Sequence, residues 1–129
     1  MARLHDIVVD CSHPAGLARF WAAVLDDYEV APYDEEELAR LRVLGIDDPE
    51  DDPSVLVEGP EGTLRLWFQR VPEPKTSKNR THLDLACEHH DVELARVVEL
   101  GARVQAAQPN DSLVVMTDPE GNEFCLLKP

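Results

Sequence analysis

Residues 4–21 read LHDIVVDCSHPAGLARFW, and residues 81–96 read THLDLACEHHDVELAR. Sliding the chain by 77 residues places His5 on His82 and, without a gap, Leu17-Ala18-Arg19 on Leu94-Ala95-Arg96. In each copy a short strand pattern precedes an apolar stripe with helical spacing. Two copies of one supersecondary unit are the simplest account of this match.

The first copy is predicted to contain one strand, one helix and three further strands. Their expected positions, in chain order, are Leu4 to Cys11, Ala15 to Leu25, Leu38 to Ile46, Ser54 to Glu58 and Thr63 to Val71. The third lies inside a strongly acidic segment, Asp26 to Asp52, which is expected to be solvated. The last two are joined by Gly59-Pro60-Glu61-Gly62, a sequence that suits a tight turn.

The second copy repeats this order after a polar connector, Pro72 to Arg80. Its expected elements are a strand at His82 to Cys87, a helix at Asp91 to Leu100, and strands at Arg103 to Ala106, Leu113 to Met116 and Glu123 to Leu127. Gly101 follows the helix where a left-handed cap is needed. We therefore expect one domain over residues 1–129, made of module one (1–71), the connector (72–80) and module two (81–129).

This element order predicts an α+β fold of two tandem βαβββ modules. A single module of this kind cannot bury both faces of its sheet, so the two copies are expected to pair. The curved mixed sheets would then surround a central cleft for a small molecule.

Composition narrows the class of partner. The 129 residues are 43% apolar and carry a formal net charge of -14, which disfavours nucleic acid and anionic membranes as partners. The first residues lack the layout of a signal peptide, so a cytoplasmic location is expected. Cys11, Cys87 and Cys125 have no paired spacing, and we expect buried, reduced thiols.

Four segments give the chain a family resemblance beyond its element order. They are Asp10-Cys11-Ser12-His13-Pro14 leading into Leu17-Ala18-Arg19-Phe20-Trp21, Gln69-Arg70-Val71-Pro72-Glu73-Pro74-Lys75, Asn79-Arg80-Thr81-His82-Leu83-Asp84-Leu85, and Asp118-Pro119-Glu120-Gly121-Asn122-Glu123-Phe124. Together they resemble glyoxalase-like proteins of the vicinal oxygen chelate superfamily, which includes glyoxalase I, extradiol dioxygenases and the fosfomycin and bleomycin resistance proteins. The resemblance also implies a homodimer.

Metal ligands in that superfamily come from the first and last strands of each module. By this resemblance His5, His82 and Glu123 would bind a divalent metal (Fe, Mn, Zn or Ni), although some relatives hold none. Two imidazoles and one carboxylate leave coordination positions open for substrate or oxygen. A fourth ligand would fall near Leu64 or Arg65, neither of which binds metal.

Strand alternation identifies further candidates for the site. If Leu64, Leu66 and Phe68 pack on the helix, then Arg65, Trp67 and Gln69 face the cleft, because side chains alternate along a strand, and are candidate substrate-binding residues. Asp84 shares a face with His82. With Glu123 it is a candidate catalytic residue, acting as a base or orienting a ligand imidazole, and a plain hydrogen-bonding role stays open.

Two classes of function are compatible with these residues. The first is a small-molecule enzyme, a lyase, isomerase or dioxygenase that uses a divalent metal. The second is a metal-free protein of the bleomycin resistance type, which sequesters an apolar or aromatic ligand against Trp67 and aliphatic strand residues.

Overall fold

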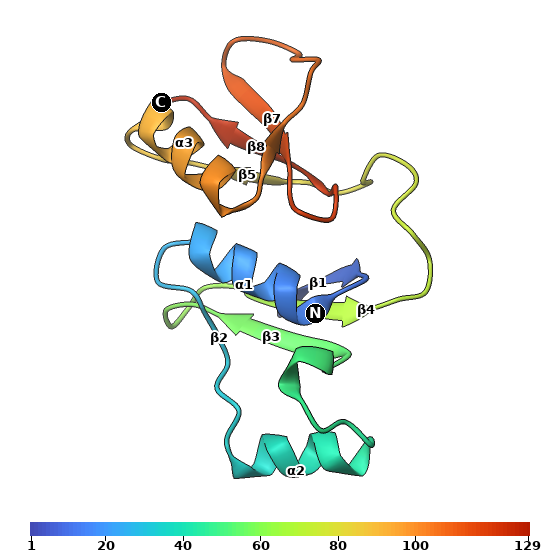
Figure 1. The fold of residues 1–129 in the computed structure, drawn as a ribbon. Helices are drawn as coiled ribbons and strands as arrows, with labels where there is room; N and C mark the ends of the chain where they lie inside the picture. The colour runs from blue at the N-terminus through green and yellow to red at the C-terminus, as the bar shows by residue number, and fades with distance from the viewer. The chain divides into compact units, whose positions relative to one another are not determined.

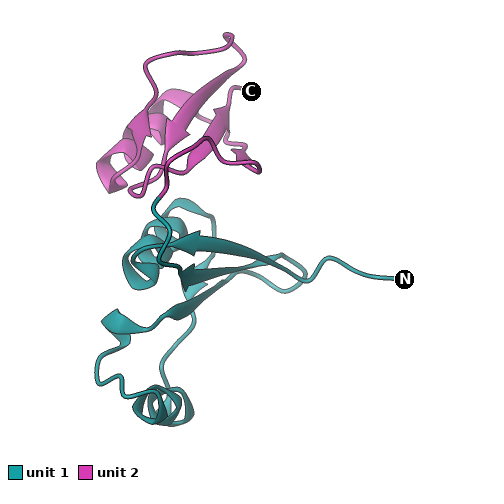
Figure 2. Cartoon of the chain, turned by 90° about the vertical axis from the view of Figure 1, so that its right-hand side faces the viewer, with its two compact units in different colours: residues 1–74 teal, residues 75–129 magenta.

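Each half of the chain forms its own four-stranded mixed sheet with one long helix packed on one face (Figure 1). The computed structural model describes residues 1–129. The chain divides into two compact units, residues 1–74 (unit 1) and 75–129 (unit 2), shown in teal and magenta in Figure 2. The division falls inside the predicted connector. No helix is long and apolar enough to cross a membrane.

The two units have the same strand order. Unit 1 contains β1 (Asp6–Cys11), α1 (Pro14–Val24), β2 (Glu29–Val30), α2 (Glu35–Val43), the 3-10 helix η1 (Pro49–Asp51), β3 (Ser54–Glu58) and β4 (Arg65–Arg70). Unit 2 contains β5 (Leu83–Leu85), α3 (His90–Leu100), β6 (Arg103–Val104), β7 (Leu113–Thr117) and β8 (Glu123–Leu127). The sheets are ordered β1-β4-β3-β2 and β5-β8-β7-β6, and in each the first strand runs parallel to the last. The predicted α+β fold of two βαβββ modules is confirmed.

Strand alternation builds the core of unit 1. Leu66 and Phe68 on β4 are 4% and 0% exposed and lie on the same side of the sheet as α1. The helix buries Leu17, Phe20 and Trp21 in return. Each fully buried large side chain contributes about 1.5–3 kcal/mol, so this face outweighs the polar opposite face in fixing the strand register.

Unit 2 uses the same device with fewer residues. Val97 on α3 and Met116, Phe124 and Leu126 on the sheet are each at most 1% exposed. The helix ends at Gly101, whose φ of 125° is readily adopted only by glycine, and this confirms the predicted cap.

The acidic segment differs from its prediction. Residues 38–46 were expected to form a strand, but α2 occupies Glu35–Val43, and the second strand of the module is β2. The side chain of Asp34 caps the helix by accepting a hydrogen bond from the Glu37 amide at 2.9 Å. Acidic residues in the first turn and Arg40 and Arg42 in the last turn complement the helix dipole.

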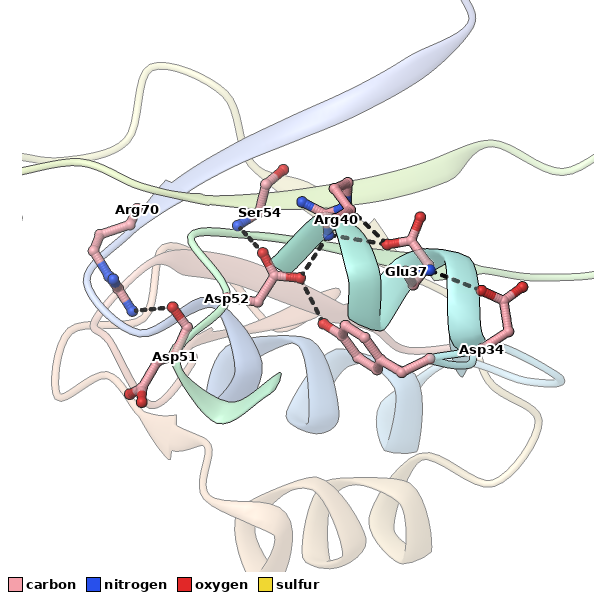
Figure 3. A network of polar contacts seen from close by, with 8 residues as sticks. Asp34, Glu37, Arg40, Asp51, Asp52, Ser54 and Arg70 are labelled. Carbon is pink, nitrogen blue, oxygen red and sulfur yellow. Dashed lines mark hydrogen bonds and ion pairs between the residues drawn. The ribbon is translucent and has the colours of Figure 1, made fainter. Parts of the chain in front are cut away.

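A buried carboxylate ties this helix to the sheet of unit 1 (Figure 3). Asp52 is 1% exposed and accepts hydrogen bonds from the Tyr33 hydroxyl at 2.7 Å, Arg40 Nη2 at 3.1 Å and the Ser54 amide at 2.9 Å. Burial, followed by the bond to Asp52, raises the pKa of Tyr33 well above its usual value. Leu41, 1% exposed, adds the helix's one buried apolar contact.

Candidate functional site

The candidate residues lie on the two sheet faces that point away from the long helices. We call face 1 the strand residues of unit 1 that point away from α1. They include Asp6, Val8, Asp10, Leu56, Arg65, Trp67 and Gln69. Face 2 is the corresponding surface of unit 2, away from α3. It includes Asp84, Val115, Thr117, Glu123 and Cys125, with His82 directly before β5.

Face 1 is organised around one ion pair. Arg65 donates to both carboxylate oxygens of Asp6, from Nε at 2.8 Å and from Nη2 at 3.0 Å, and this bidentate arrangement is the strong form of such a pair. Trp67 Nε1 donates to the same carboxylate at 3.1 Å. Hydrogen bonding to Arg65, with His5 and Trp67 adding to it, holds the pKa of Asp6 well below its usual range although burial opposes the shift.

The three predicted substrate-binding residues therefore lie on one face, and each is already engaged. Gln69 donates to Asp10 Oδ1 at 2.9 Å, as Arg65 and Trp67 do to Asp6. An anion at Arg65 would compete with the Asp6 carboxylate. Between the polar contacts, Val8, Trp67 and Leu56 are paired across three strands, and Val8 is 53% exposed.

Face 2 gathers potential metal ligands. The Nε2 atom of His82 lies 3.3 Å from Oδ1 of Asp84. Ligand atoms of His82, Asp84 and Cys125 all lie within 4.8 Å of one another. Cys125 pairs with Asp84 across the parallel β5 and β8 strands and is 7% exposed. Burial raises the pKa of the Cys125 thiol, and the Asp84 carboxylate raises it further.

Glu123 lies on the same face but outside this cluster. Its carboxylate accepts a hydrogen bond from Lys75 Nζ at 3.1 Å and one from the Asn79 amide at 2.9 Å. Burial raises the pKa of Glu123, but the hydrogen bonds from the Asn79 amide, its own amide and Lys75 together outweigh burial and leave the pKa below its usual value. The carboxylate is therefore charged at neutral pH and held in place from the connector side.

The structure corrects the alignment of the two modules by one residue. Helices α1 and α3 each have 11 residues and begin 76 positions apart, at Pro14 and His90. This offset matches buried Trp21 with buried Val97 and buried Ala18 with half-buried Leu94, whereas the offset of 77 matches buried Ala18 with exposed Ala95. The shared Leu-Ala-Arg triplet misled the alignment because identical letters there occupy different helix faces.

With this offset, equivalent residues of the two modules can be identified. Ile7 and Leu83 both lie on the helix side of their sheets, so Asp6 corresponds to His82. Arg65 pairs with Asp6 and corresponds to Glu123. The register left open between Leu64 and Arg65 is thereby decided for Arg65.

His5 lies directly before β1 in unit 1. Its Nδ1 atom is 2.9 Å from Asp6 Oδ2, and its side chain is 78% exposed. Its participation in a metal site with His82 and Glu123 stays a prediction.

The donor set of face 2 fits a divalent metal. Imidazole, carboxylate and thiolate are the protein ligands of zinc and related ions. Face 1 does not offer such a set, because Arg65 neutralises the Asp6 carboxylate at the matching position. The sequence predicted His82, Asp84 and Glu123 as candidate site residues but not Cys125, although Cys125 shares the strand parity of Glu123.

The chain matches a known protein family and several solved structures. A family model described as "Glyoxalase-like domain" matches residues 6–127. Curated protein sequences give no significant match.

Several solved structures share the fold at low sequence identity. The fosfomycin resistance protein FosX from Mesorhizobium loti has a TM-score of 0.65 and 14% identity, covering 100% of this chain and 93% of its own. A glyoxalase/bleomycin resistance protein/dioxygenase family enzyme from Burkholderia phytofirmans has a TM-score of 0.64 and 15% identity, covering 97% of both chains. FosX from Listeria monocytogenes, in a mutant complexed with Mn(II) and 1S,2S-dihydroxypropylphosphonic acid, has a TM-score of 0.63 and 11% identity, covering 98% of this chain and 90% of its own.

Proposed function

The chain belongs to the glyoxalase-like domain family of the glyoxalase, bleomycin resistance and dioxygenase superfamily, and from that premise we propose that it is a small-molecule enzyme with a divalent metal on face 2. The observation that carries the proposal is the grouping of His82, Asp84, Glu123 and Cys125 on one sheet face. The Mn(II) complex of the Listeria relative agrees with this class of cofactor.

His82 and Glu123 are the proposed metal ligands carried by unit 2. The ionised Glu123 carboxylate supplies negative charge, while Asp84, 3.3 Å from the His82 ring, fixes the orientation of the imidazole. A bound divalent ion polarises substrate oxygens and stabilises developing negative charge. We propose a lyase, isomerase or dioxygenase reaction, and Arg65, Trp67 and Gln69 on face 1 stay predicted substrate contacts.

Metal uptake tests this proposal without knowledge of the substrate. Equilibrium dialysis against Mn(II), Zn(II) and Co(II) should give about one equivalent bound to the wild type. The double variant His82→Ala with Glu123→Ala should lose that binding, whereas His89→Ala, an exposed histidine outside face 2, should retain it. Uptake below about a tenth of an equivalent in the wild type would contradict the proposal.

Turnover supplies the second half of the test. The metal-loaded protein would be assayed with catechols, hemithioacetals and epoxides, which represent ring cleavage, isomerisation and epoxide addition. We expect one class to react, and the double variant to be inactive. Equal turnover by the double variant would show that a metal bound by His82 and Glu123 is not needed for the reaction.

A metal-free binding function is favoured by one separate observation. The apolar row Val8, Trp67 and Leu56 crosses the middle of face 1, and Val8 is 53% exposed. Such a row can hold an aromatic ligand by contact alone. Bleomycin added to chelator-treated protein should change the fluorescence of Trp67, and Trp67→Phe should abolish this change. The absence of any change in the wild type would contradict this alternative.

The homodimer stays a prediction, which analytical ultracentrifugation tests.

A further inference from the structure

We propose that His82, Asp84 and Cys125 form a thiolate-containing site for a Zn(II)-like metal on face 2. The inference rests on the proposed function only in placing the metal on face 2, and it changes the ligands. Zn(II), Co(II) and Cd(II) are the ions that this mixture of nitrogen, oxygen and sulfur selects.

Distances among the ligand atoms support a single ion. Zinc binds histidine nitrogen and carboxylate oxygen at about 2.0–2.2 Å and thiolate sulfur at about 2.3 Å, so tetrahedral ligands stand roughly 3.3–3.6 Å apart. His82 Nε2 and Asp84 Oδ1 are already 3.3 Å apart. Because all three ligand atoms lie within 4.8 Å of one another, Cys125 needs only a small side-chain adjustment.

The sheet itself supplies the preorganisation. Asp84 and Cys125 are Cα partners in the parallel β5–β8 ladder, so their side chains leave the sheet on the same side. Phe124 and Leu126, which flank Cys125, are 0% and 1% exposed and anchor β8 against the core. The thiol position is thereby fixed by two buried neighbours.

Glu123 is less available to an ion at His82. Its oxygens are already bonded to Lys75 and the Asn79 amide, and it lies outside the cluster. Recruiting it would break its charge-assisted contact with Lys75, whereas the contacts that the cluster would give up, His82 with Asp84 and the Cys125 thiol with Asp84, join the proposed ligands to one another. Three protein ligands would leave a fourth position open, as catalytic zinc sites do.

Cobalt spectroscopy distinguishes the two ligand sets in the intact chain. Co(II) titrated into reduced, metal-free wild type should produce a sulfur-to-cobalt charge-transfer band in the near ultraviolet. Cys125→Ser should remove the band and weaken Co(II) binding by more than about a hundredfold, the upper end of what the loss of an outer-shell partner costs. Cys87→Ser is the matched control and should leave both unchanged.

The outcomes separate this inference from the proposed function. If Co(II) binds without the charge-transfer band, and Glu123→Gln abolishes binding, the thiolate site is wrong while the proposed function stands. If no divalent ion binds at all, both fail. Should Cys125→Ser fold poorly, X-ray absorption of zinc-loaded wild type decides, since the site requires one sulfur neighbour at about 2.3 Å and a shell of nitrogen and oxygen alone overturns it.

Discussion

Face 1 and face 2 hold different chemistry at matching positions of one duplicated fold. In unit 1 the matching pair is Asp6 and Arg65, which bond to each other through two hydrogen bonds. In unit 2 the matching pair is His82 and Glu123, which do not bond to each other. His82 contacts Asp84, and Glu123 accepts hydrogen bonds from Lys75 and the Asn79 amide. A bidentate ion pair neutralises its own charge, whereas the donors of face 2 can still accept a cation.

This difference shows that the repeated fold fixes where side chains stand but not what they do. Both sheets bury one face on a helix by strand alternation and leave the other face free for polar residues. On face 1 that freedom is used for contacts within the sheet. We infer that the metal chemistry of this chain belongs to unit 2.

The largest expected effect concerns what the two units share, their cores. Phe68 and Phe124 are each 0% exposed on the last strand of their sheets, on the side opposite faces 1 and 2. Truncation to Ala should lower the free energy of unfolding by about 3–5 kcal/mol in either case, through lost transfer energy and a cavity. Urea unfolding followed by circular dichroism measures this, with exposed Val92→Ala as the control, expected within about 0.5 kcal/mol. A negligible loss at one phenylalanine would break the equivalence of the two cores.

The next effect concerns the acidic insertion, which unit 2 lacks. Asp52→Ala removes the acceptor of the Tyr33, Arg40 and Ser54 bonds and should cost about 2–3 kcal/mol, since a buried charged hydrogen-bond acceptor is lost. Asp51→Ala is the matched control, because Asp51 is bonded only through its backbone carbonyl in this network. Equal unfolding free energies for the two variants would show that the network does not anchor α2.

A smaller, pH-dependent effect should distinguish face 1. The pKa of Asp6 is lowered in the folded state, so its contribution to stability is full above its unfolded pKa of about 3.9 and is lost as pH falls through the folded pKa. Asp6→Asn should therefore lower the Tm at pH 7, and the difference from wild type should shrink on acidification below pH about 4. Thermal unfolding at several pH values checks this, and a difference independent of pH would contradict the ion-pair account.

A similar but more exposed pair gives a comparison for the acid range. Glu50 accepts hydrogen bonds from Arg19 and His13, which lower its pKa to about 2. Because both carboxylates have lowered pKa values, the Tm of the wild type should fall as the pH drops below about 4. Glu50→Gln removes one of the two carboxylates and should make this fall in Tm less steep. The effect should be smaller than that of Asp6→Asn, because the side chain of Glu50 is 43% exposed against 17% for Asp6. The reverse order would contradict this ranking.

Local patterns in the sequence were sufficient for most elements of the two modules and for the sides of their longer strands. Alternation around Leu66 and Phe68 correctly placed Arg65, Trp67 and Gln69 together, because period-two patterning is a local property. The helix α2 was not predictable in this way, since only Leu41 is buried and the helix depends on its cap and on Asp52.

The candidate site depended more on contacts between distant residues. Cys125 meets Asp84 only because β5 and β8 become parallel neighbours, and Lys75 reaches Glu123 from the connector. Neither contact leaves a periodic signal. The one-residue error in the repeat offset had the same origin, because the true offset is set by helix packing rather than by matching letters.

Isothermal titration of Zn(II) into the intact, reduced protein tests the central claim most directly, by comparing His82→Ala with Asp6→Asn, the matching positions of the two faces. The account predicts about one equivalent bound by the wild type and by Asp6→Asn, and a loss of this binding in His82→Ala. Zn(II) binding that survives in His82→Ala and disappears in Asp6→Asn would place the metal on unit 1 and contradict the account.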